Sequence, residues 1–179
     1  MDFQTHQPFL KMYIEKTKGD ILEFGTGDGS TGFILDLIKG TDRKLISIEN
    51  NENWLNKMKS LYPENEQHKY HFVLDWESFI KQMKPEKYSI VFIDQSPWEA
   101  RIMSLNHFKD VAEYIIIHDA DYFPTNKLFG SVIPNKKFED SFNFDDVFKN
   151  WKLYFPEKPY PYYTGPPTLV GSNTGNSIV

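Results

Sequence analysis

Five carboxylates recur along this chain, each at the end of a short apolar run or directly after one. In chain order they are Glu23, Glu49, Asp75, Asp94 and Asp119. If the apolar runs are neighbouring strands, these acidic groups gather at one edge of a sheet and repel one another. A cationic ligand, a metal ion or a cluster of hydrogen-bond donors would neutralise them. The spacing therefore predicts a binding site at that edge.

A glycine-rich turn follows the first apolar run, in the stretch DILEFGTGDGSTGF. The three glycines at alternate positions, Gly25, Gly27 and Gly29, allow a sharp turn and a close approach to a ligand. The serine and threonine after them suit the start of a helix, whose free N–H groups favour a carboxylate or phosphate. The residues expected to hold a ligand here are Glu23, Gly25, Thr26, Gly27, Asp28, Gly29, Ser30 and Thr31. Since Glu23 and Asp28 disfavour a pyrophosphate but favour an amino group, we expect a ligand with both a carboxylate and a cation.

The second carboxylate, Glu49, lies 24 residues after Gly25 and is followed by Asn50. A carboxylate at this position accepts hydrogen bonds from two ribose hydroxyls in related sheets. Such a charge-assisted bond contributes roughly 1.5–3 kcal/mol. An adenosine with an amino-acid arm satisfies both ends of the site, and the ligand predicted is S-adenosylmethionine.

The elements that position these residues alternate between strands and helices. The predicted strands cover 20–24, 44–49, 71–74, 88–94 and 114–119, and the helices between them cover 31–38, 53–61, 76–83 and 98–108. Strands that are apolar almost throughout are typical of a parallel sheet covered by helices on both faces. Right-handed crossovers then give a Rossmann-like, doubly wound α/β sheet.

The pattern changes after Asp119. A helix is predicted over 143–151, followed by strands at 152–155 and 168–172, which suggest an antiparallel hairpin that completes a mostly parallel, seven-stranded sheet. We expect a single domain over 1–179, with an N-terminal helical region at 1–20. The segments 120–143 and 156–167 are expected to be substrate-side loops, with a wall formed by Trp98, Tyr160, Tyr162 and Tyr163.

Composition limits the partners. The chain has 179 residues, a net charge of −5 and no cysteine, which argues against nucleic acid or an anionic membrane as partner and excludes thiolate chemistry. Residues 1–16 show no signal peptide, and no apolar run reaches the length of a membrane span. We expect a cytoplasmic protein that acts on a small molecule or a glycan; a homodimer is an assembly that the sequence leaves open.

Five segments in order resemble class I S-adenosylmethionine-dependent methyltransferases. They are ILEFGTGDGSTG, LISIEN, VLDWESF, IVFIDQS and YIIIHDAD, which together cover about residues 21–121. The resemblance implies that Asp75 lies near the exocyclic amine of the adenine and that Trp76 lies near its ring face. The residues themselves allow another interpretation, in which Asp75 is a helix N-cap and Trp76 is core packing.

Within that family, the first, second and fourth segments are most similar to small catechol-type and sugar O-methyltransferases. That resemblance implies a divalent cation such as Mg²⁺ on Asp94, Asp119 and Asp121. The chain departs from the pattern at two places. Ala120 follows Asp119, where the family usually has an aspartate or an asparagine. Pro97 stands where the family has a lysine base.

A hydroxyl acceptor must lose a proton, and a positioned general base contributes about 10²–10⁴-fold to such a transfer. His118 and Asp119 are the candidates, with Asp94 as the third catalytic residue. Deprotonation by His118 and deprotonation assisted by a metal remain open alternatives, and His118 could instead be a packed histidine without a chemical role.

The sequence thus predicts an S-adenosylmethionine-dependent O-methyltransferase. Two alternatives come from other classes: an NAD-binding oxidoreductase and a catalytically silent S-adenosylmethionine-binding module. Ser30 stands where a dinucleotide fingerprint has its third glycine, which argues against the oxidoreductase. An N-methyltransferase is disfavoured because DQSPW lacks the proline spacing usual in those enzymes.

Overall fold

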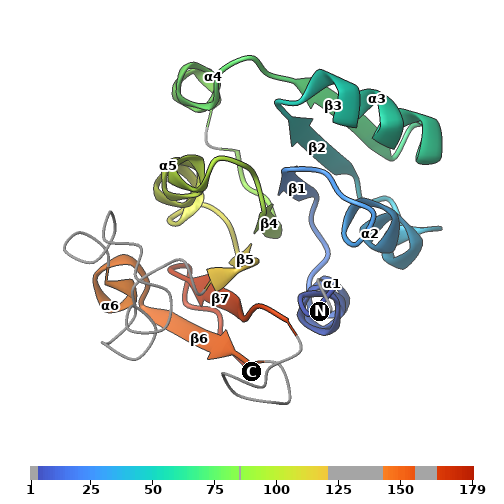
Figure 1. The fold of residues 1–179 in the computed structure, drawn as a ribbon. Coiled ribbons are helices and arrows are strands. Elements are labelled where there is room, and N and C mark those ends of the chain that lie inside the picture. The colour runs from blue at the N-terminus through green and yellow to red at the C-terminus, as the bar shows by residue number, and fades with distance from the viewer. Residues whose placement is uncertain (1–3, 85, 121–142, 156–164) are drawn as a thin grey trace.

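The protein is described by a computed structural model that covers residues 4–84, 86–120, 143–155 and 165–179. Its strands are β1 (Ile21–Phe24), β2 (Leu45–Glu49), β3 (His68–Phe72), β4 (Ile90–Ile93), β5 (Tyr114–Ile117), β6 (Asn150–Tyr154) and β7 (Thr168–Ser172). They form one sheet in the order β3-β2-β1-β4-β5-β7-β6 (Figure 1). β1 to β5 are parallel, and β7 runs antiparallel to β5 and β6. The predicted fold class is confirmed.

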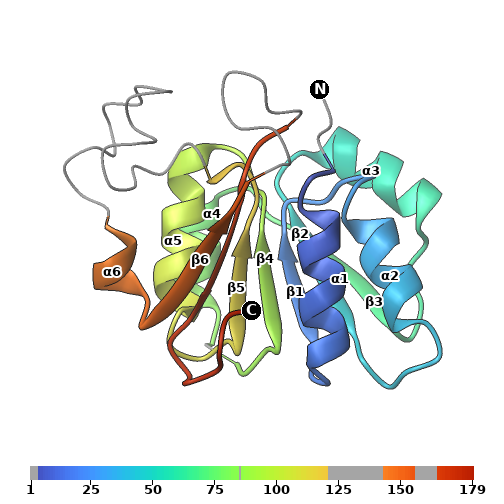
Figure 2. The ribbon, with the colours of Figure 1, turned by 90° about the horizontal axis from the view of Figure 1, so that it is seen from below.

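Helices cover both faces of this sheet. They are α1 (Gln7–Lys16), α2 (Thr31–Ile38), α3 (Glu52–Leu61), α4 (Trp76–Gln82), α5 (Trp98–Phe108) and α6 (Phe144–Val147). α1 and α2 pack over one face, and α4, α5 and α6 pack over the other, each with its own cluster of buried apolar side chains. Figure 2 shows α1 and α2 side by side beside β1. Within the described ranges, no helix combines the length and apolarity needed to cross a membrane.

The central strands form because their residues are apolar on both sides. All residues of β1, β4 and β5 are buried. Glu23 is the polar exception in β1, and its partners in the neighbouring strands are Ser47 of β2 and Phe92 of β4. A carboxylate in the middle of such a sheet must be hydrogen-bonded, since burying it otherwise costs several kcal/mol.

The strand predicted at 71–74 is wrong, because β3 begins three residues earlier, at His68. Tyr70 packs against Leu55 and Met58 of α3, and this contact fixes the strand. Two of the three apolar residues that suggested the later strand are at the surface instead: Phe72 is 42% exposed and Leu74 is 88% exposed, whereas Val73 is buried just after β3 ends.

The helix predicted over 143–151 is also wrong at its end. α6 stops at Val147, and Trp151 belongs to β6. Phe148 is extended and its ring lies over Gly171 of β7, where a Cβ atom would come within 2.6 Å of the ring. The packing of Phe148 on this glycine ends the helix and directs the chain into β6.

Candidate active site

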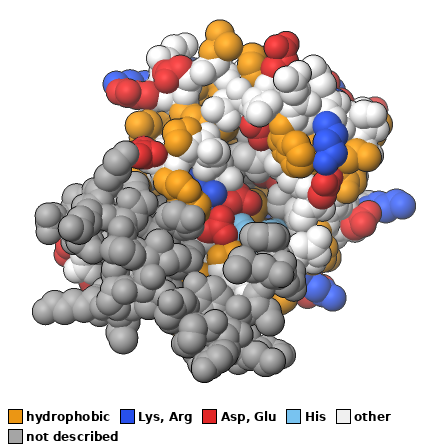
Figure 3. Space-filling view, viewed as in Figure 1, with side chains coloured by type: hydrophobic (Ala, Val, Ile, Leu, Met, Phe, Trp, Pro, Cys, Tyr) orange, Lys and Arg blue, Asp and Glu red, His pale blue; other side chains and the backbone are white. Residues whose placement is uncertain are grey.

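The carboxyl ends of β1, β2 and β4 surround a pocket of about 650 Å³. It is lined by Gly25, Thr26, Glu49, Asn50, Asn51, Glu52, Trp54, Phe72, Asp94, Ser96 and Pro97. Figure 3 looks onto this edge of the sheet and shows acidic and histidine side chains together in a hollow. Open α/β sheets bind their ligands at this edge, and the volume lies in the range of small-molecule sites.

Gly25 starts the turn with a φ of 82°, the left-handed region that favours glycine. A Cβ atom on Gly25 would lie 2.7 Å from the carbonyl oxygen of Asp94 and from the backbone nitrogen of Gln95. The end of β1 therefore touches the backbone that follows β4, and a larger residue here would push the two apart.

Glu49 lies at the pocket wall and is 6% exposed. Its Oε2 accepts hydrogen bonds from the backbone N–H and the hydroxyl of Thr26, both at 3.1 Å. Its Oε1 accepts from the N–H groups of Asn50 and Asn51, both at 2.9 Å. Since a carboxylate offers about four acceptor sites, a ribose hydroxyl would replace one of these donors, and the Thr26 hydroxyl can rotate away.

Glu23 lies beneath the turn and is fully buried. Its carboxylate accepts hydrogen bonds from the hydroxyls of Ser30 at 2.6 Å, Thr31 at 2.9 Å and Ser47 at 2.6 Å. Burial raises the pKa of Glu23 to about 7, although these three hydroxyls favour the charged form. Glu23, Ser30 and Thr31 thus support the turn from below and do not line the described pocket.

The other predicted turn residues are placed at its rim. Asp28 forms an exposed ion pair with Lys57 of α3, with a distance of 3.1 Å between Nζ and Oδ2. The carbonyl oxygen of Gly29 accepts a hydrogen bond of 2.8 Å from the side-chain amide of Gln7, so the N-terminal segment covers this part of the turn. Gly27 donates its N–H to the hydroxyl of Thr31.

Asp75 and Trp76 do not reach the pocket. Asp75 is exposed and caps α4 by accepting a hydrogen bond from the N–H of Ser78. Trp76 is 4% exposed and belongs to the core beside Phe24. These contacts agree with the alternative interpretation of the sequence, in which Asp75 is a helix N-cap and Trp76 is core packing. Among the described residues, the aromatic side chains at the pocket wall are instead Phe72 and Trp54, and no pattern in the sequence singles these two out.

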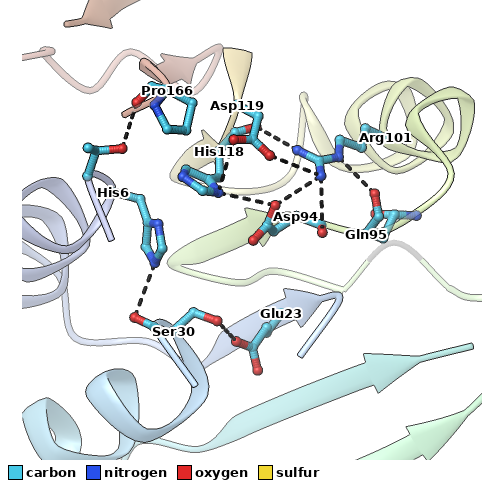
Figure 4. A network of polar contacts seen from close by, with 11 residues as sticks. His6, Glu23, Ser30, Asp94, Gln95, Arg101, His118, Asp119 and Pro166 are labelled. Carbon is cyan, nitrogen blue, oxygen red and sulfur yellow. Dashed lines mark hydrogen bonds and ion pairs between the residues drawn. The ribbon is translucent and has the colours of Figure 1, made fainter. Parts of the chain in front are cut away.

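The predicted catalytic residues come together at the ends of β4 and β5 (Figure 4). His118 Nδ1 lies 3.3 Å from Asp94 Oδ1 and 3.7 Å from Asp119 Oδ1. One possible ligand atom from each of the three lies within 4.8 Å of the others, as a shared ion would require. Asp119 has a φ of 51°, a strained conformation for a non-glycine residue. Asp121 lies outside the described residues.

Arg101 of α5 completes this cluster and was not predicted. Its side chain is 5% exposed, and Nη2 lies 3.0 Å from Asp94 Oδ1 and 3.6 Å from Asp119 Oδ2. The buried face of α5 is Ala100, Arg101, Ser104, Leu105 and Phe108. Arg101 is the one charged residue on this buried face, and a buried cation requires a buried partner. The helical spacing of the buried residues of α5 is therefore the sequence signal that could have identified Arg101.

Each member of the cluster changes the pKa values of the others. Burial raises the pKa of Asp94, but His118 and the Arg101 charge outweigh it, and the pKa is lowered overall. Burial lowers the pKa of His118, but the two carboxylates outweigh it and the pKa is raised. Burial raises the pKa of Asp119. The cluster therefore favours an ionised Asp94 and stabilises the imidazolium that forms when His118 accepts a proton.

His6 is the second residue that sequence reasoning missed. It is 2% exposed, its ring centroid lies 4.3 Å from that of His118, and its Nε2 lies 3.1 Å from the carbonyl oxygen of Gly29. His6 therefore bridges the glycine turn and the proposed base (Figure 4). It precedes α1, and no pattern in the sequence links it to these elements.

Comparisons with known proteins give no match to a protein-family profile or to a curated protein. Solved structures do match. A Staphylococcus aureus protein described as a caffeoyl-CoA O-methyltransferase has a TM-score of 0.63 at 15% identity, over 95% of this chain and 83% of that one. A Klebsiella pneumoniae protein described as an O-methyltransferase has a TM-score of 0.59 at 16% identity, over 94% and 80%.

A third similar structure is TomG of Streptomyces achromogenes, an O-methyltransferase involved in tomaymycin synthesis and solved with S-adenosylmethionine. Its TM-score is 0.56 at 16% identity, over 94% of this chain and 80% of that one. At these identities the likeness concerns the fold. The protein therefore has the fold of S-adenosylmethionine-dependent methyltransferases, in agreement with the resemblance of its sequence.

Proposed function

We propose that this protein is an S-adenosylmethionine-dependent methyltransferase that modifies a hydroxyl oxygen of a small molecule or a sugar. The observation that carries the proposal is the joined site at the carboxyl edge, where a pocket lined by Gly25 and Glu49 also includes Asp94 of the acidic cluster. The fold of the similar O-methyltransferases supports the same class of reaction.

The pocket residues fit the cofactor. Gly25 lines the pocket without a side chain, Glu49 and Asn50 offer hydrogen-bonding groups to a ribose, and Phe72 and Trp54 offer flat faces to an adenine. When bound, S-adenosylmethionine supplies a methyl group activated by a positively charged sulfur. The turn from Gly25 to Thr31, with Asp28 at its rim, is the proposed site for the amino-acid arm.

His118 is the proposed base. A neutral imidazole at this position would accept the proton that the acceptor hydroxyl loses when it is methylated. Within the described residues, Nε2 of His118 has no hydrogen-bond partner, while Nδ1 faces Asp94 and Asp119. The two carboxylates stabilise the imidazolium that results.

A divalent cation such as Mg²⁺ on Asp94, Asp119 and Asp121 is the alternative aid, since a bound cation lowers the pKa of a hydroxyl. Arg101 bears directly on this choice, because its guanidinium already lies against the first two carboxylates.

The proposed acceptor, a sugar or an aromatic ring, is supported by one residue beside the cluster. Trp98 is half-buried, and its ring lies 3.7 Å from the Arg101 guanidinium carbon. Sugars and aromatic rings stack on side chains of this kind, so Trp98 is proposed as part of the acceptor wall. The other proposed wall residues, Tyr160, Tyr162 and Tyr163, lie outside the described residues, as does most of the two proposed substrate-side loops at 120–143 and 156–167.

The test is a calorimetric titration with S-adenosylhomocysteine of the wild type, Glu49→Ala and Asp36→Ala. Asp36 is an exposed carboxylate of α2 and serves as the matched control. We expect micromolar binding that weakens about tenfold or more in Glu49→Ala and is unchanged in Asp36→Ala. Absence of binding to the folded wild type would overturn the proposal, and a reduced-nicotinamide titration would then test the oxidoreductase alternative.

A silent binding module remains distinguishable from an enzyme. It would bind S-adenosylhomocysteine but release none from S-adenosylmethionine with any sugar or phenol acceptor. We expect release of S-adenosylhomocysteine with at least one such acceptor, in proportion to the enzyme added.

A further inference from the structure

We propose that Arg101 takes the place of the divalent cation at this site, so that the Asp94–His118–Asp119 cluster works without a metal. The inference rests on the proposed function for the role of the cluster in proton transfer. Whether Arg101 or a metal ion lies between the carboxylates is a property of the folded chain and does not depend on that function. It follows from the position of one guanidinium group.

The first observation is the contact itself. Nη2 of Arg101 lies 3.0 Å from Oδ1 of Asp94 and 3.6 Å from Oδ2 of Asp119. It therefore faces one oxygen of each of the two carboxylates that a metal would need (Figure 4). An arginine is charged at every pH at which a protein is folded, so this positive charge is permanent.

The second observation is that the guanidinium is held in place. Its Nε donates to the carbonyl oxygen of Gln95 at 2.8 Å, Nη1 donates to that of His118 at 2.6 Å, and Nη2 donates to that of Asp94 at 3.2 Å. These carbonyls follow β4 and β5, so the side chain joins the ends of both strands. A side chain with this many fixed partners and 5% exposure does not swing aside to admit an ion.

The third observation is the charge balance. Arg101 already sets one permanent positive charge against both carboxylates, before any ion adds more. An ion bound to Oδ1 of Asp94 at the usual distance of about 2.5 Å would come within about 5.5 Å of Nη2. There it would meet a fixed positive charge that is only weakly screened by solvent.

The donor set points the same way. Mg²⁺ is usually held by one or two carboxylates together with waters, and both carboxylates in the described part of the cluster already face the guanidinium. We conclude that these residues do not fit a hard divalent cation while Arg101 is present. Arg101 is then a positioning residue: it holds both carboxylates beside His118, which handles the proton.

The test measures Mn²⁺ binding by electron paramagnetic resonance on the full chain, without any acceptor. For the wild type we expect no bound Mn²⁺ up to about 1 mM free ion, which corresponds to a Kd weaker than that value. We also expect the same S-adenosylhomocysteine affinity before and after treatment with a chelator. Wild-type binding with a Kd below about 100 µM that is lost in Asp94→Asn would overturn the proposal.

Arg101→Met removes the charge at similar length, and we expect this variant to gain Mn²⁺ binding by at least about tenfold over the wild type. Arg101→Lys keeps a positive charge and should not gain it. Arg43→Met is the matched control, because Arg43 is also buried but donates to Gly19, Ile14 and Ser89, with no carboxylate among these partners.

A folded Arg101→Met that binds no more Mn²⁺ than Arg43→Met would also overturn the proposal. If Arg101→Met does not fold, the wild-type measurement and Arg101→Gln still decide it. Failure of S-adenosylhomocysteine to bind would instead remove the proposed function and leave the Mn²⁺ result standing, so the two outcomes are distinguishable.

Discussion

On the β1–β2 side of the carboxyl edge, Glu23 and Glu49 are surrounded by neutral donors, namely hydroxyls and backbone N–H groups. On the β4–β5 side, the two aspartates lie against the charges of Arg101 and His118. Carboxylates at neighbouring strand ends thus avoid mutual repulsion in two ways. Neutral donors leave the local charge negative, which suits a cationic ligand, whereas paired charges leave a balanced site in which a proton can move.

The sharpest test of this division is His118→Asn. His118 handles the proton on the β4–β5 side and takes no part in the β1–β2 side, where the cofactor is proposed to bind. We therefore expect turnover to fall by about 10²–10⁴-fold. The affinity for S-adenosylhomocysteine should stay within about twofold of the wild type. Release of S-adenosylhomocysteine with an accepted hydroxyl compound measures the first quantity and calorimetry measures the second. His71→Asn is the control, because His71 is exposed on β3. Equal turnover in the two variants would contradict the assignment of the base.

Gly25→Ala tests the place where the two sides touch. A Cβ atom there would lie 2.7 Å from backbone atoms of Asp94 and Gln95, and the φ is 82°. We expect a loss of about 3 kcal/mol in the free energy of unfolding by urea. Gly40→Ala shares the positive φ, but its Cβ meets nothing within 4 Å, so it should cost only about 1 kcal/mol. Similar losses of unfolding free energy in the two variants would show that the close contact of Gly25 with the backbone of Asp94 and Gln95 does not affect stability.

Glu23→Gln tests whether the β1–β2 side stores a titratable charge. The folded-state pKa of Glu23 is about 7, above the ordinary value of 4.5. The folded state therefore binds the proton more tightly, and its contribution to stability is present below about pH 4.5 and is lost as the pH rises toward 7. The wild type should lose about 3 kcal/mol relative to Glu23→Gln between pH 4.5 and 8.

Urea unfolding of both proteins at several pH values measures this difference. Parallel curves for the wild type and Glu23→Gln would mean that the three hydroxyls cancel the cost of burial. The β1–β2 side would then carry a fully charged glutamate at every pH tested.

The smallest effect is expected from Lys57→Met. The Lys57–Asp28 ion pair is about half exposed on both sides, so its loss should change the free energy of unfolding by less than about 0.5 kcal/mol. S-adenosylhomocysteine affinity should stay within about twofold. A large loss of affinity would mean that α3 fixes the glycine turn through this pair, and that the β1–β2 side depends on charges as well.

Much of the fold could be predicted from the sequence, because β1, β4 and β5 are short apolar runs bounded by polar residues. β3 was misplaced because its buried residues, His68 and Tyr70, are polar or amphipathic, while the more apolar Phe72 and Leu74 are exposed. Apolar residues are buried only on average. At the β3 edge of the sheet, where Phe72 lines the pocket, hydrophobicity does not predict which residues are buried.

Most residues of the site could be predicted from the sequence, but not which of them face the pocket and which are buried beneath it. The positions of Asp94, His118 and Asp119 follow from the strand ends, and the structure brings them together. Whether a carboxylate faces the pocket or the core depends on packing, and Glu23 lies below the turn for that reason. Arg101 and His6 come from elements distant in sequence, and only their tertiary contacts reveal them.

The position of β7 has a consequence for how the chain acquires its site during synthesis. β7 is inserted between β5 and β6, although it is made after both. The carbonyl oxygen of Pro167, just before β7, accepts a hydrogen bond from the N–H of Ala120, next to Asp119. A nascent chain that has reached only β6 therefore leaves one edge of β5 unpaired, and unpaired edges invite aggregation. The ribosome must therefore release β7 before the edge of β5 next to the acidic cluster is covered, and premature termination would release a chain prone to misassembly.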